Sequence, residues 1–469
     1  MKHAMLFLAL VAAGAAAADG PYLATGIKIG EVTPDAAMVW ARLTRDAERV
    51  PFGGPMPIIR SRNDVPEVTY PEGASVDALE GACPGAPGEV RVRYAPAGTE
   101  AWRETAWQGV DPERDFTCRV LLEGLTPDTR YVLRVETRGP EGAPGQTIEG
   151  GFRTAPGPEV PARVVFTVTT GQRYPHQDAP GGGFRIYDAM LALDPNFFVH
   201  TGDILYYDEL AKSLELARWH WARTYSLPTN VNFHRQVASY FEKDDHDTWC
   251  NDCWPGMETK RMGAFTFAQG QAVFLEQVPM SEKTYRTFRW GKDLQIWLVE
   301  GRDYRSANAL PDGPEKTIWG AEQKAWFKRT VSASDAAFRV LISPTPLVGP
   351  DRPRKADNHA NATFAHEGRE LRRFIADQER MIVVCGDRHW QYVSVDGETG
   401  LREYSCGPAS DEHAGGWKQE DVRPEHRYLN VIGGYLAVTV DREGGRPVMR
   451  LRHCGVDGDV LHEDVLRAE

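Results

Sequence analysis

The sequence has few cysteines, an excess of acidic over basic residues, and no long hydrophobic segment beyond its first twenty residues. Seven Cys in 469 residues are too sparse for a disulfide scaffold, and the odd number leaves at least one thiol without a partner Cys in this chain. No later stretch reaches the roughly 20 apolar residues of a membrane-spanning helix. With 54 Lys and Arg against 66 Asp and Glu, the formal net charge is −12, which disfavours nucleic-acid binding by bulk charge. We therefore expect no disulfide-rich module, no transmembrane segment and no nucleic-acid binding by bulk charge.

Hydrophobic residues make up 42% of the chain and are spread along it, which predicts buried cores in two to three domains. At the N-terminus, Lys2 and His3 precede a short apolar run that ends in small residues near Ala16 to Ala18. This pattern favours a signal peptide over residues 1–18 rather than the start of a buried helix. It predicts a protein exported to the periplasm or the extracellular space, where disulfides can form.

Residues 21–156 show short alternating runs separated by Pro and Gly, which is the pattern of a β-sandwich. We expect strands at 36–43, 89–96 and 129–139. Leu125, Pro127, Thr129 and Tyr131, followed by GFRTAP at 151–156, resemble a fibronectin type III module, in which Tyr131 would form a tyrosine corner. Residues 44–88 are rich in Pro and Gly and read as an insertion.

From residue 163 to 469 the pattern changes to apolar strands alternating with amphipathic helices, which predicts an α/β domain. Expected strands are 163–170, 196–203, 294–301, 338–346 and 380–387, and expected helices are 184–193, 209–225 and 321–332. The last forty residues return to antiparallel strands.

Three clusters of polar residues, each containing Asp, follow apolar runs of this domain. They are Asp203 with Tyr206, the DDHD segment at 244–247, and Asp387 with His389. Each alone is as readily a turn or a solvated loop. In open α/β folds, however, loops beyond the carboxyl ends of strands converge. Converging carboxylates and imidazoles indicate metal ions, which offset the repulsion among the carboxylates, and two bridged ions recur in phosphoester-cleaving enzymes.

The motifs GD-x-x-Tyr (202–206), DDH (244–246) and GD-x-H (386–389), after an exported fibronectin-like module, resemble the PhoD-like alkaline phosphatase and phosphodiesterase family. This family belongs to the metallophosphoesterase superfamily and is related to the purple acid phosphatases. The resemblance runs from about residue 26 to about residue 441. It implies an α+β fold of αββα type, a two-sheet sandwich flanked by helices, behind the N-terminal β-sandwich.

The resemblance also implies roles for individual residues. Asp203 would bridge two metals, and Tyr206 and His389 would bind the first metal. Asp245 and Asp387 would bind the second metal, and His246 would be the general acid. A metal-activated hydroxide would attack the phosphorus in line. The cofactors expected are two or more divalent or trivalent ions, with Fe, Ca, Zn and Mn all compatible.

One ligand of the family is missing. The family has a Cys that binds the first metal at the place occupied here by Gly171. Glycine has no ligand side chain, so the identity and occupancy of the first metal stay open, with Thr170, Gln172 and His176 as possible substitutes. The family's Trp and Glu beside the DDH motif are Lys243 and Asp247 here.

Other polar residues fit a phosphate site outside these motifs. His359, within the basic segment 352–359, and Arg388 are candidate phosphate contacts, against the alternatives of a solvated loop and of structural ion pairs. The Gly-rich segment 405–417 reads as a turn in preference to an active-site loop that contributes His413. Cys250 and Cys253 form a CxxC pair after the DDHD segment, and we expect them to form a disulfide that braces this loop.

The sequence thus predicts an exported, metal-dependent hydrolase of small-molecule or lipid phosphate esters, of the alkaline phosphatase/phosphodiesterase type. One alternative is a phosphodiesterase or phospholipase D-like specificity. Another is a non-catalytic binding protein built on a decayed phosphoesterase fold, suggested by the missing Cys. The oligomeric state is left open.

Overall fold

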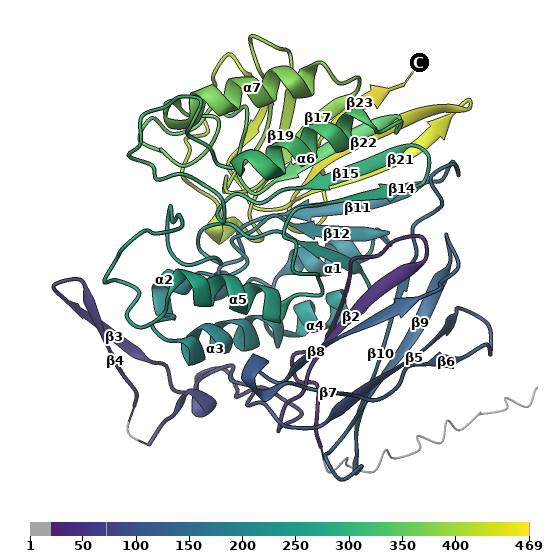
Figure 1. The fold of residues 1–469 in the computed structure, drawn as a ribbon, viewed down its shortest axis with the longest axis vertical. Coiled ribbons are helices and arrows are strands. Elements are labelled where there is room, and N and C mark those ends of the chain that lie inside the picture. Colours follow the sequence, from purple (N-terminus) through teal and green to yellow (C-terminus); the bar gives the residue numbers. More distant parts are fainter. Residues whose placement is uncertain (1–19, 72, 469) are drawn as a thin grey trace, which may run out of the picture.

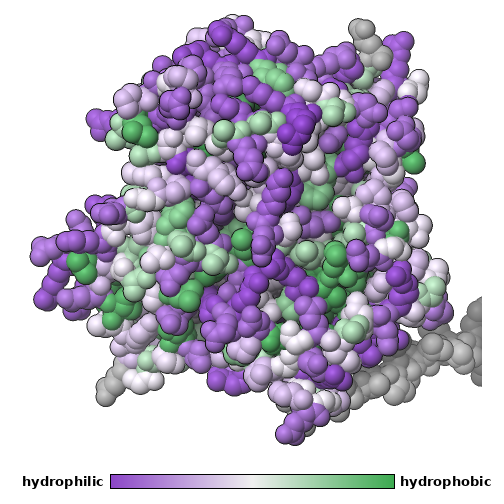
Figure 2. Space-filling model, viewed as in Figure 1, coloured by the Kyte–Doolittle hydropathy of each residue, from purple (hydrophilic) through white to green (hydrophobic). Residues whose placement is uncertain are grey.

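The computed structural model describes residues 20–71 and 73–468 (Figure 1). The predicted signal peptide, residues 1–18, lies outside these described residues. Among the residues described, no helix is long and apolar enough to cross a bilayer. On the face drawn in Figure 2, polar side chains predominate and hydrophobic residues form small, separated patches.

A nine-stranded sheet forms one half of the central sandwich. Its middle strands β11, β12 and β13 are parallel, and β21 runs antiparallel beside β11. The order across the sheet is β23 (Val460–Arg467), β22 (Arg446–Cys454), β21 (Tyr435–Glu443), β11 (Val164–Thr169), β12 (Phe197–His200), β13 (Ala238–Phe241), β1 (Ile27–Gly30), β2 (Ala36–Arg42) and β8 (Thr117–Glu123).

A seven-stranded sheet forms the other half. Its strands β15, β16, β17 and β19 are parallel, and antiparallel strands complete both edges. The order is β14 (Arg286–Trp290), β15 (Leu294–Leu298), β16 (Phe338–Ser343), β17 (Met381–Cys385), β19 (Arg402–Cys406), β18 (Gln391–Val395) and β20 (His426–Asn430).

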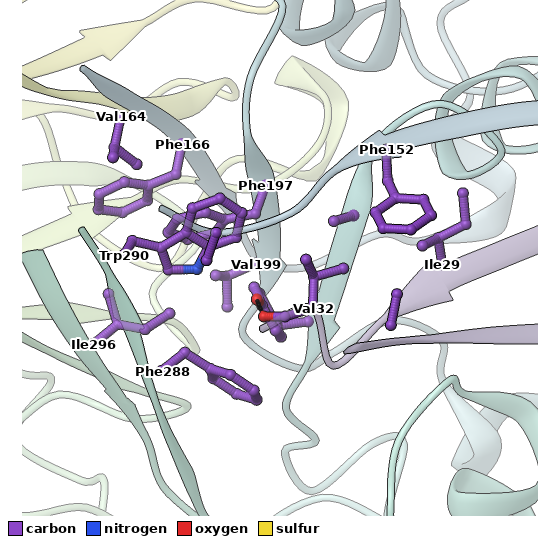
Figure 3. Packing of buried hydrophobic residues seen from close by; sticks show 14 of the residues in the cluster. Ile29, Val32, Phe152, Val164, Phe166, Phe197, Val199, Phe288, Trp290 and Ile296 are labelled. Atoms are coloured by element: carbon purple, nitrogen blue, oxygen red, sulfur yellow. Dashed lines mark hydrogen bonds between the residues drawn. The ribbon is translucent and has the colours of Figure 1, made fainter. Parts of the chain in front are cut away.

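The two sheets bury a shared core. Phe166 and Phe197 of the first sheet stack with ring centroids 4.7 Å apart, and Trp290 of the second sheet packs 4.8 Å from Phe197 (Figure 3). Alternate residues of β15 divide between layers: Ile296 enters this core, whereas Trp297 points toward the outer helices. Successive side chains of a strand point to opposite faces of the sheet, and here both faces are covered. The central strands therefore have continuous apolar sequences.

Helices cover the outer face of each sheet, which gives the four layers expected from the sequence. Beside the nine-stranded sheet lie α1 (Arg185–Leu191), α2 (Tyr207–Leu210), α3 (Leu214–Tyr225), α4 (Pro228–His234) and α5 (Phe267–Gln277), and beside the other sheet lie α6 (Gly320–Ser332) and α7 (Ala365–Ala376). Local signals set some helix ends. The Thr266 and Gln269 side chains form a reciprocal capping box at the start of α5, and Ser213 caps α3. Short 3-10 turns are η1 (Val76–Ala78), η2 (Pro112–Arg114), η3 (Tyr174–His176), η4 (Ala362–Phe364) and η5 (Asp411–His413).

The N-terminal region contributes strands to both a small sheet and the nine-stranded sheet. The small sheet contains β10 (Pro144–Arg153), β9 (Arg130–Arg138), β5 (Glu89–Pro96), β6 (Arg103–Glu104) and β7 (Gln108–Gly109). It packs on β1, β2 and β8, and β1 pairs in parallel with β13 at Ile29 and Ala238. The N-terminal sandwich therefore shares a sheet with the rest of the chain, and the division at 156–163 stays a prediction.

Two further sequence expectations concern this region. The Tyr131 hydroxyl accepts a hydrogen bond from the Thr126 amide at 2.9 Å, which ties the tyrosine to the backbone upstream as expected. The fibronectin type III likeness itself stays a prediction. The 44–88 insertion carries a projecting hairpin of β3 (Ile58–Arg62) and β4 (Val65–Thr69) (Figure 1).

Candidate metal centre

The three predicted motifs meet at one end of the sandwich. Strands β12 and β13 are adjacent and in register, His200 beside Phe241, so the loops that follow them leave the sheet at the same edge. The loop after β17 reaches them from the other sheet, where the Asp387 amide donates to Thr170 Oγ1 at 3.3 Å. Because both sheets send loops to this point, residues far apart in sequence become neighbours.

The GD dipeptides turn their carboxylates toward this point through unusual backbone conformations. Asp203 has φ 53° and Asp387 has φ 59°, in the left-handed region that Asp tolerates better than most residues. The preceding glycines are required by close approach. A Cβ at Gly202 would lie 2.5 Å from the Asp244 amide nitrogen, and one at Gly386 would lie 2.4 Å from Thr201 Oγ1.

The side chain of Asp247 joins the first two loops. Its carboxylate accepts from the Asp244 amide at 2.6 Å and from the Ile204 amide at 3.1 Å. The residue that replaces the family's Glu here thus holds the loops together. Lys243 points away from the centre and is paired with Glu300 at 2.9 Å and Asp303 at 2.5 Å, so it adds no free positive charge to the site.

The first half of the centre is formed by Asp203, Tyr206 and His389. Asp203 Oδ2, Tyr206 Oη and His389 Nε2 are each 3.3 Å from the other two. Ligands bound to one metal at about 2.1 Å lie about 3 Å apart, so this triangle fits a coordination site. Burial lowers the pKa of His389 to about 3, which keeps its imidazole neutral and able to bind a cation.

The second half of the centre is richer in carboxylates. Oxygens of Asp203, Asp244 and Asp387 lie within 4.8 Å of one another, as do ligand atoms of Asp203, Asp245 and His246. Burial, together with neighbouring carboxylates, raises the pKa of Asp203 to about 6 and that of Asp244 to about 7. Buried anions this close require compensating positive charge.

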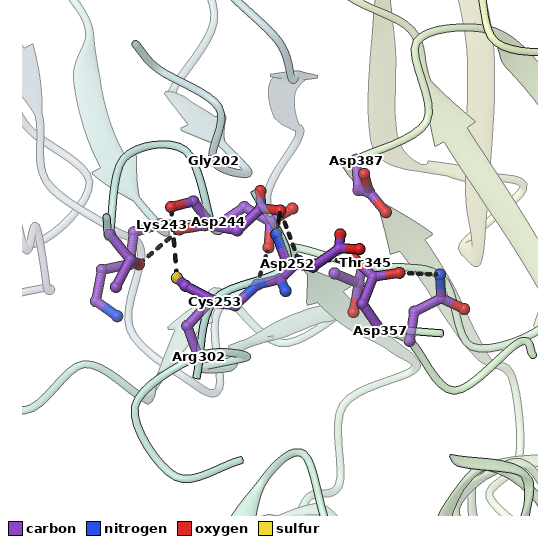
Figure 4. A network of polar contacts seen from close by, with 12 residues as sticks. Gly202, Lys243, Asp244, Asp252, Cys253, Arg302, Thr345, Asp357 and Asp387 are labelled. Atoms are coloured by element: carbon purple, nitrogen blue, oxygen red, sulfur yellow. Dashed lines mark hydrogen bonds and ion pairs between the residues drawn. The ribbon is translucent and has the colours of Figure 1, made fainter. Parts of the chain in front are cut away.

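Arg302 supplies part of that charge from behind the carboxylates (Figure 4). Its fully buried guanidinium lies 2.6 Å from Asp244, 3.3 Å from Asp357 and 3.8 Å from Asp245. Although burial opposes ionisation, Arg302, His246 and Lys355 together hold the pKa of the Asp245 carboxyl below its usual range. Lys355 also pairs with Asp252 at 2.7 Å.

His246 lies at the edge of the centre, partly exposed, with Nδ1 2.9 Å from Asp208 Oδ1. Burial opposes its protonation, but Asp245, Asp203 and Asp208 outweigh this and raise the pKa of His246 well above its ordinary value. This environment favours the protonated imidazole, which is the form that a general acid needs.

A small pocket of about 110 Å³ opens over the centre. It is lined by Asp203, Asp245, His246, Asn251, Arg352, Lys355, Asp387, His389, Trp390 and Gly415. Carboxylates and imidazoles form its floor, and Asn251, Arg352 and Lys355 add hydrogen-bond donors beside them.

Two predicted phosphate contacts are wrong for this geometry. Arg388 has a fully buried side chain that pairs with Asp351 at 2.6 Å and contacts Asp387, so it braces a carboxylate and does not face the pocket. His359 is 1% exposed, its Nε2–H donates to Glu367 Oε2 at 3.0 Å, and its ring packs on Trp319. Both side chains have carboxylate partners inside the protein, which the sequence pattern did not reveal.

The predicted disulfide is also absent. Cys250 and Cys253 are both buried free thiols, and Cys253 Sγ lies 3.6 Å from the carbonyl oxygen of Asp245. The hydrophobic contacts of Cys253 with the α3 and α5 core hold this loop without a covalent bridge.

Two residues near the centre were not among the predicted site residues. Asp244 is the first residue of the DDH motif, and its carboxylate lies with those of Asp203 and Asp387. His413 of η5, which the turn pattern disfavoured as a site residue, lies with Nε2 2.8 Å from Tyr206 Oη. The Gly-rich sequence around His413 was the one sequence feature that suggested an active-site loop there.

A two-sheet sandwich with acidic and imidazole side chains gathered beyond its strand ends defines the metallophosphoesterase class. The family model described as PhoD-like phosphatase matches residues 166–423, more than half of the chain, and that of the PhoD-like phosphatase N-terminal domain matches residues 9–156. The chain therefore belongs to the PhoD-like phosphatase family and is a phosphoester hydrolase.

Solved structures agree on the fold. The chain is similar to the structure of PhoD, with a TM-score of 0.72 and 16% identity over 96% of this chain and 91% of that one. It is also similar to the purple acid phosphatase PPD1 from yellow lupin (Lupinus luteus) seeds, with a TM-score of 0.63 and 12% identity over 94% of this chain and 74% of that one. No curated protein matches the sequence.

Proposed function

We propose that this phosphoesterase is metal dependent and that Asp203, Tyr206, Asp245, Asp387 and His389 hold its ions. The observation that carries the proposal is the Asp203 carboxylate. Its Oδ2 faces Tyr206 and His389, whereas its Oδ1 is buried without a hydrogen-bond partner in the described part of the chain. A buried carboxylate oxygen without a partner is costly, and a cation bound there would remove that cost.

The donor types fit such ions. Carboxylate oxygens suit hard cations such as Ca²⁺ and Mn²⁺, and imidazole with phenolate suits Fe or Zn²⁺. When bound, the ions would supply Lewis-acid neutralisation of the phosphoryl oxygens and a lowered pKa of water.

The chain's own residues supply the remaining functions. His246, held by Asp208, donates its proton to the oxygen of the departing alcohol. Arg352 and Lys355 at the pocket wall attract the phosphate and orient its oxygens. In the proposed reaction the nucleophile attacks the phosphorus from the side opposite the departing oxygen. This reaction requires no covalent intermediate with a protein side chain.

The proposed substrates are small-molecule or lipid phosphate esters. The pocket of about 110 Å³ is far below the roughly 300–1,000 Å³ that enclose a whole drug-sized ligand, so it takes the phosphoryl group and leaves the alcohol portion outside. This arrangement fits monoesters and diesters. Export to the periplasm or the extracellular space belongs to the same proposal and rests on residues 1–18 of the sequence.

The test measures metal content and hydrolysis together. Purified protein is analysed for bound metals, stripped with a chelator, reloaded, and assayed on p-nitrophenyl phosphate and bis(p-nitrophenyl) phosphate. We expect hydrolysis to be lost on stripping and restored on reloading. Hydrolysis by a verified metal-free protein at the original rate would overturn the proposal.

A further inference from the structure

The position of the missing Cys faces the first half of the metal centre. A Cβ built on Gly171 would lie 3.0 Å from His389 Cδ2 and 3.1 Å from His389 Nε2. A side chain at residue 171 would therefore reach the ring that lies 3.3 Å from Asp203 and Tyr206. Glycine leaves this side of the centre without a donor from its own position.

A different side chain, His413, contacts the same His389 ring. His413 Nε2 lies 2.8 Å from Tyr206 Oη and 3.3 Å from His389 Nε2, and the two imidazole rings are 4.1 Å apart at their centroids. His413 Nε2, Tyr206 Oη and His389 Nε2 thus form a second triangle, which shares an edge with the triangle that contains Asp203. Its sides, like those of the first, are the separations of neighbouring ligands on one ion.

The loop that carries His413 is hydrogen-bonded to the backbone of both Gly171 and His389. The Ala409 amide donates to the carbonyl of Gly171 at 3.0 Å, and the Gly415 amide donates to the carbonyl of His389 at 2.9 Å. The side chain of Asp411 accepts from the Gly433 amide at 3.0 Å. These contacts hold His413, which is 9% exposed, in place over the centre.

The residues beside Gly171 are occupied elsewhere. Thr170 Oγ1 lies 3.3 Å from the Gly202 carbonyl, and the Gln172 side chain bonds to Tyr187. His176 Nε2 lies 2.8 Å from an Arg173 guanidinium nitrogen. None of the three substitutes expected from the sequence reaches the Tyr206–His389 edge by a contact in the described residues.

We propose that His413 is a ligand of the first metal and supplies the donor that residue 171 lacks. The inference rests on the proposed function, because it needs a metal at Asp203, Tyr206 and His389. It also changes the ligand chemistry. An imidazole in place of a thiolate makes the ligand set less negative by one charge, and it favours borderline divalent ions such as Zn²⁺.

The test counts ions and measures their affinity in the full-length protein. Apo-protein is titrated with Zn²⁺ by calorimetry, and bound zinc is counted after gel filtration, for wild type, His413→Ala and His389→Ala. We expect His413→Ala to weaken one Zn²⁺ site by about 100-fold or more, the same site that His389→Ala removes, and to leave the other site unchanged. His176→Ala, a neighbouring histidine 5.3 Å from His413 between ring centroids, is the matched control and should bind Zn²⁺ as wild type does.

Each other outcome has a defined meaning. If His413→Ala keeps every Zn²⁺ site at wild-type affinity while wild type is metal dependent, His413 is not a ligand and the proposed function stands. If wild type binds no metal ion, both proposals fall. Should circular dichroism show His413→Ala to be unfolded, His413→Gln is used in its place, with the same loss expected and the same retention overturning the inference.

Discussion

The two halves of the metal centre are built from different chemistry. In the first half, Tyr206 and His389 lie beside a single carboxylate, Asp203, and His413 contacts Tyr206 and His389. In the second half, carboxylates crowd together, and Arg302 is buried among them. The negative charge of the first half would therefore be neutralised by a bound metal ion alone. In the second half, the Arg302 guanidinium neutralises part of the charge permanently. We expect the halves to select different metals and to respond differently to mutation.

Asp203 belongs to both halves, so its loss should have the largest effect. Asp203→Asn keeps the shape of the side chain and removes the shared negative charge. We expect kcat/KM to fall at least about 1,000-fold and bound metal to be lost from both halves, measured by ester hydrolysis and elemental analysis. Asp335→Asn, an exposed carboxylate, is the control. A variant that keeps full metal content and activity would show that the halves do not share this residue.

The Arg302→Ala variant tests whether the buried guanidinium neutralises the carboxylates of the second half. Arg302→Ala leaves Asp244 buried without its cation and Asp357 with Lys355 alone, so we expect a loss of about 3–5 kcal/mol in the free energy of unfolding, measured with urea. Arg130→Ala breaks an exposed pair with Asp194 and should cost less than about 1 kcal/mol. Equal losses in the two variants would mean that the buried carboxylates do not depend on Arg302.

His246 sharpens the comparison because it touches both halves without a predicted role as a ligand. His246→Gln should lower kcat about 100-fold or more on an alkyl phosphate, whose leaving oxygen needs a proton. On p-nitrophenyl phosphate the loss should be small, since the phenolate departs unprotonated. Metal content should not change. Equal losses on both esters together with a missing ion would instead make His246 a ligand of the second half.

The smallest expected effect concerns His453, which lies outside the metal centre. It measures how much of the protein's loss of stability in acid comes from a histidine that is not part of the centre. His453 is buried, and burial lowers its pKa to about 3. A histidine that binds its proton less tightly when folded destabilises the fold as pH falls below about 6.5, by about 2 kcal/mol at pH 5. His453→Gln should flatten the decline of the unfolding free energy between pH 7 and pH 5 by about that amount. An unchanged slope would rule out this histidine as a cause.

The sequence could predict the parts of the centre that follow buried strands. Asp203, Asp387 and His389 lie where a strand pattern ends in charge, and the sandwich fold brings them together. His413 was not predictable in the same way, because it lies in a Gly-rich turn whose position over Tyr206 depends on how β18, β19 and η5 pack. Arg388 shows the complementary failure, since residue type alone did not reveal that Asp351 holds it inside the protein.

The continuous nine-stranded sheet was also beyond the sequence pattern. A continuous apolar run indicates a strand with both faces buried, but it does not identify the neighbouring strand in the sheet. The pairing of Ile29 with Ala238 joins segments that the sequence pattern assigned to separate domains, 21–156 and 163–469. Local pattern therefore located the elements, whereas contacts between distant segments had to come from the structure.

The most direct test of the two-part centre is a crystal structure of the metal-loaded protein with anomalous scattering recorded at metal absorption edges. We predict two peaks on either side of the Asp203 carboxylate, one in contact with Tyr206 and His389 and the other with Asp245 and Asp387. A metal-loaded, active protein with no anomalous peak in contact with Asp203 would contradict it.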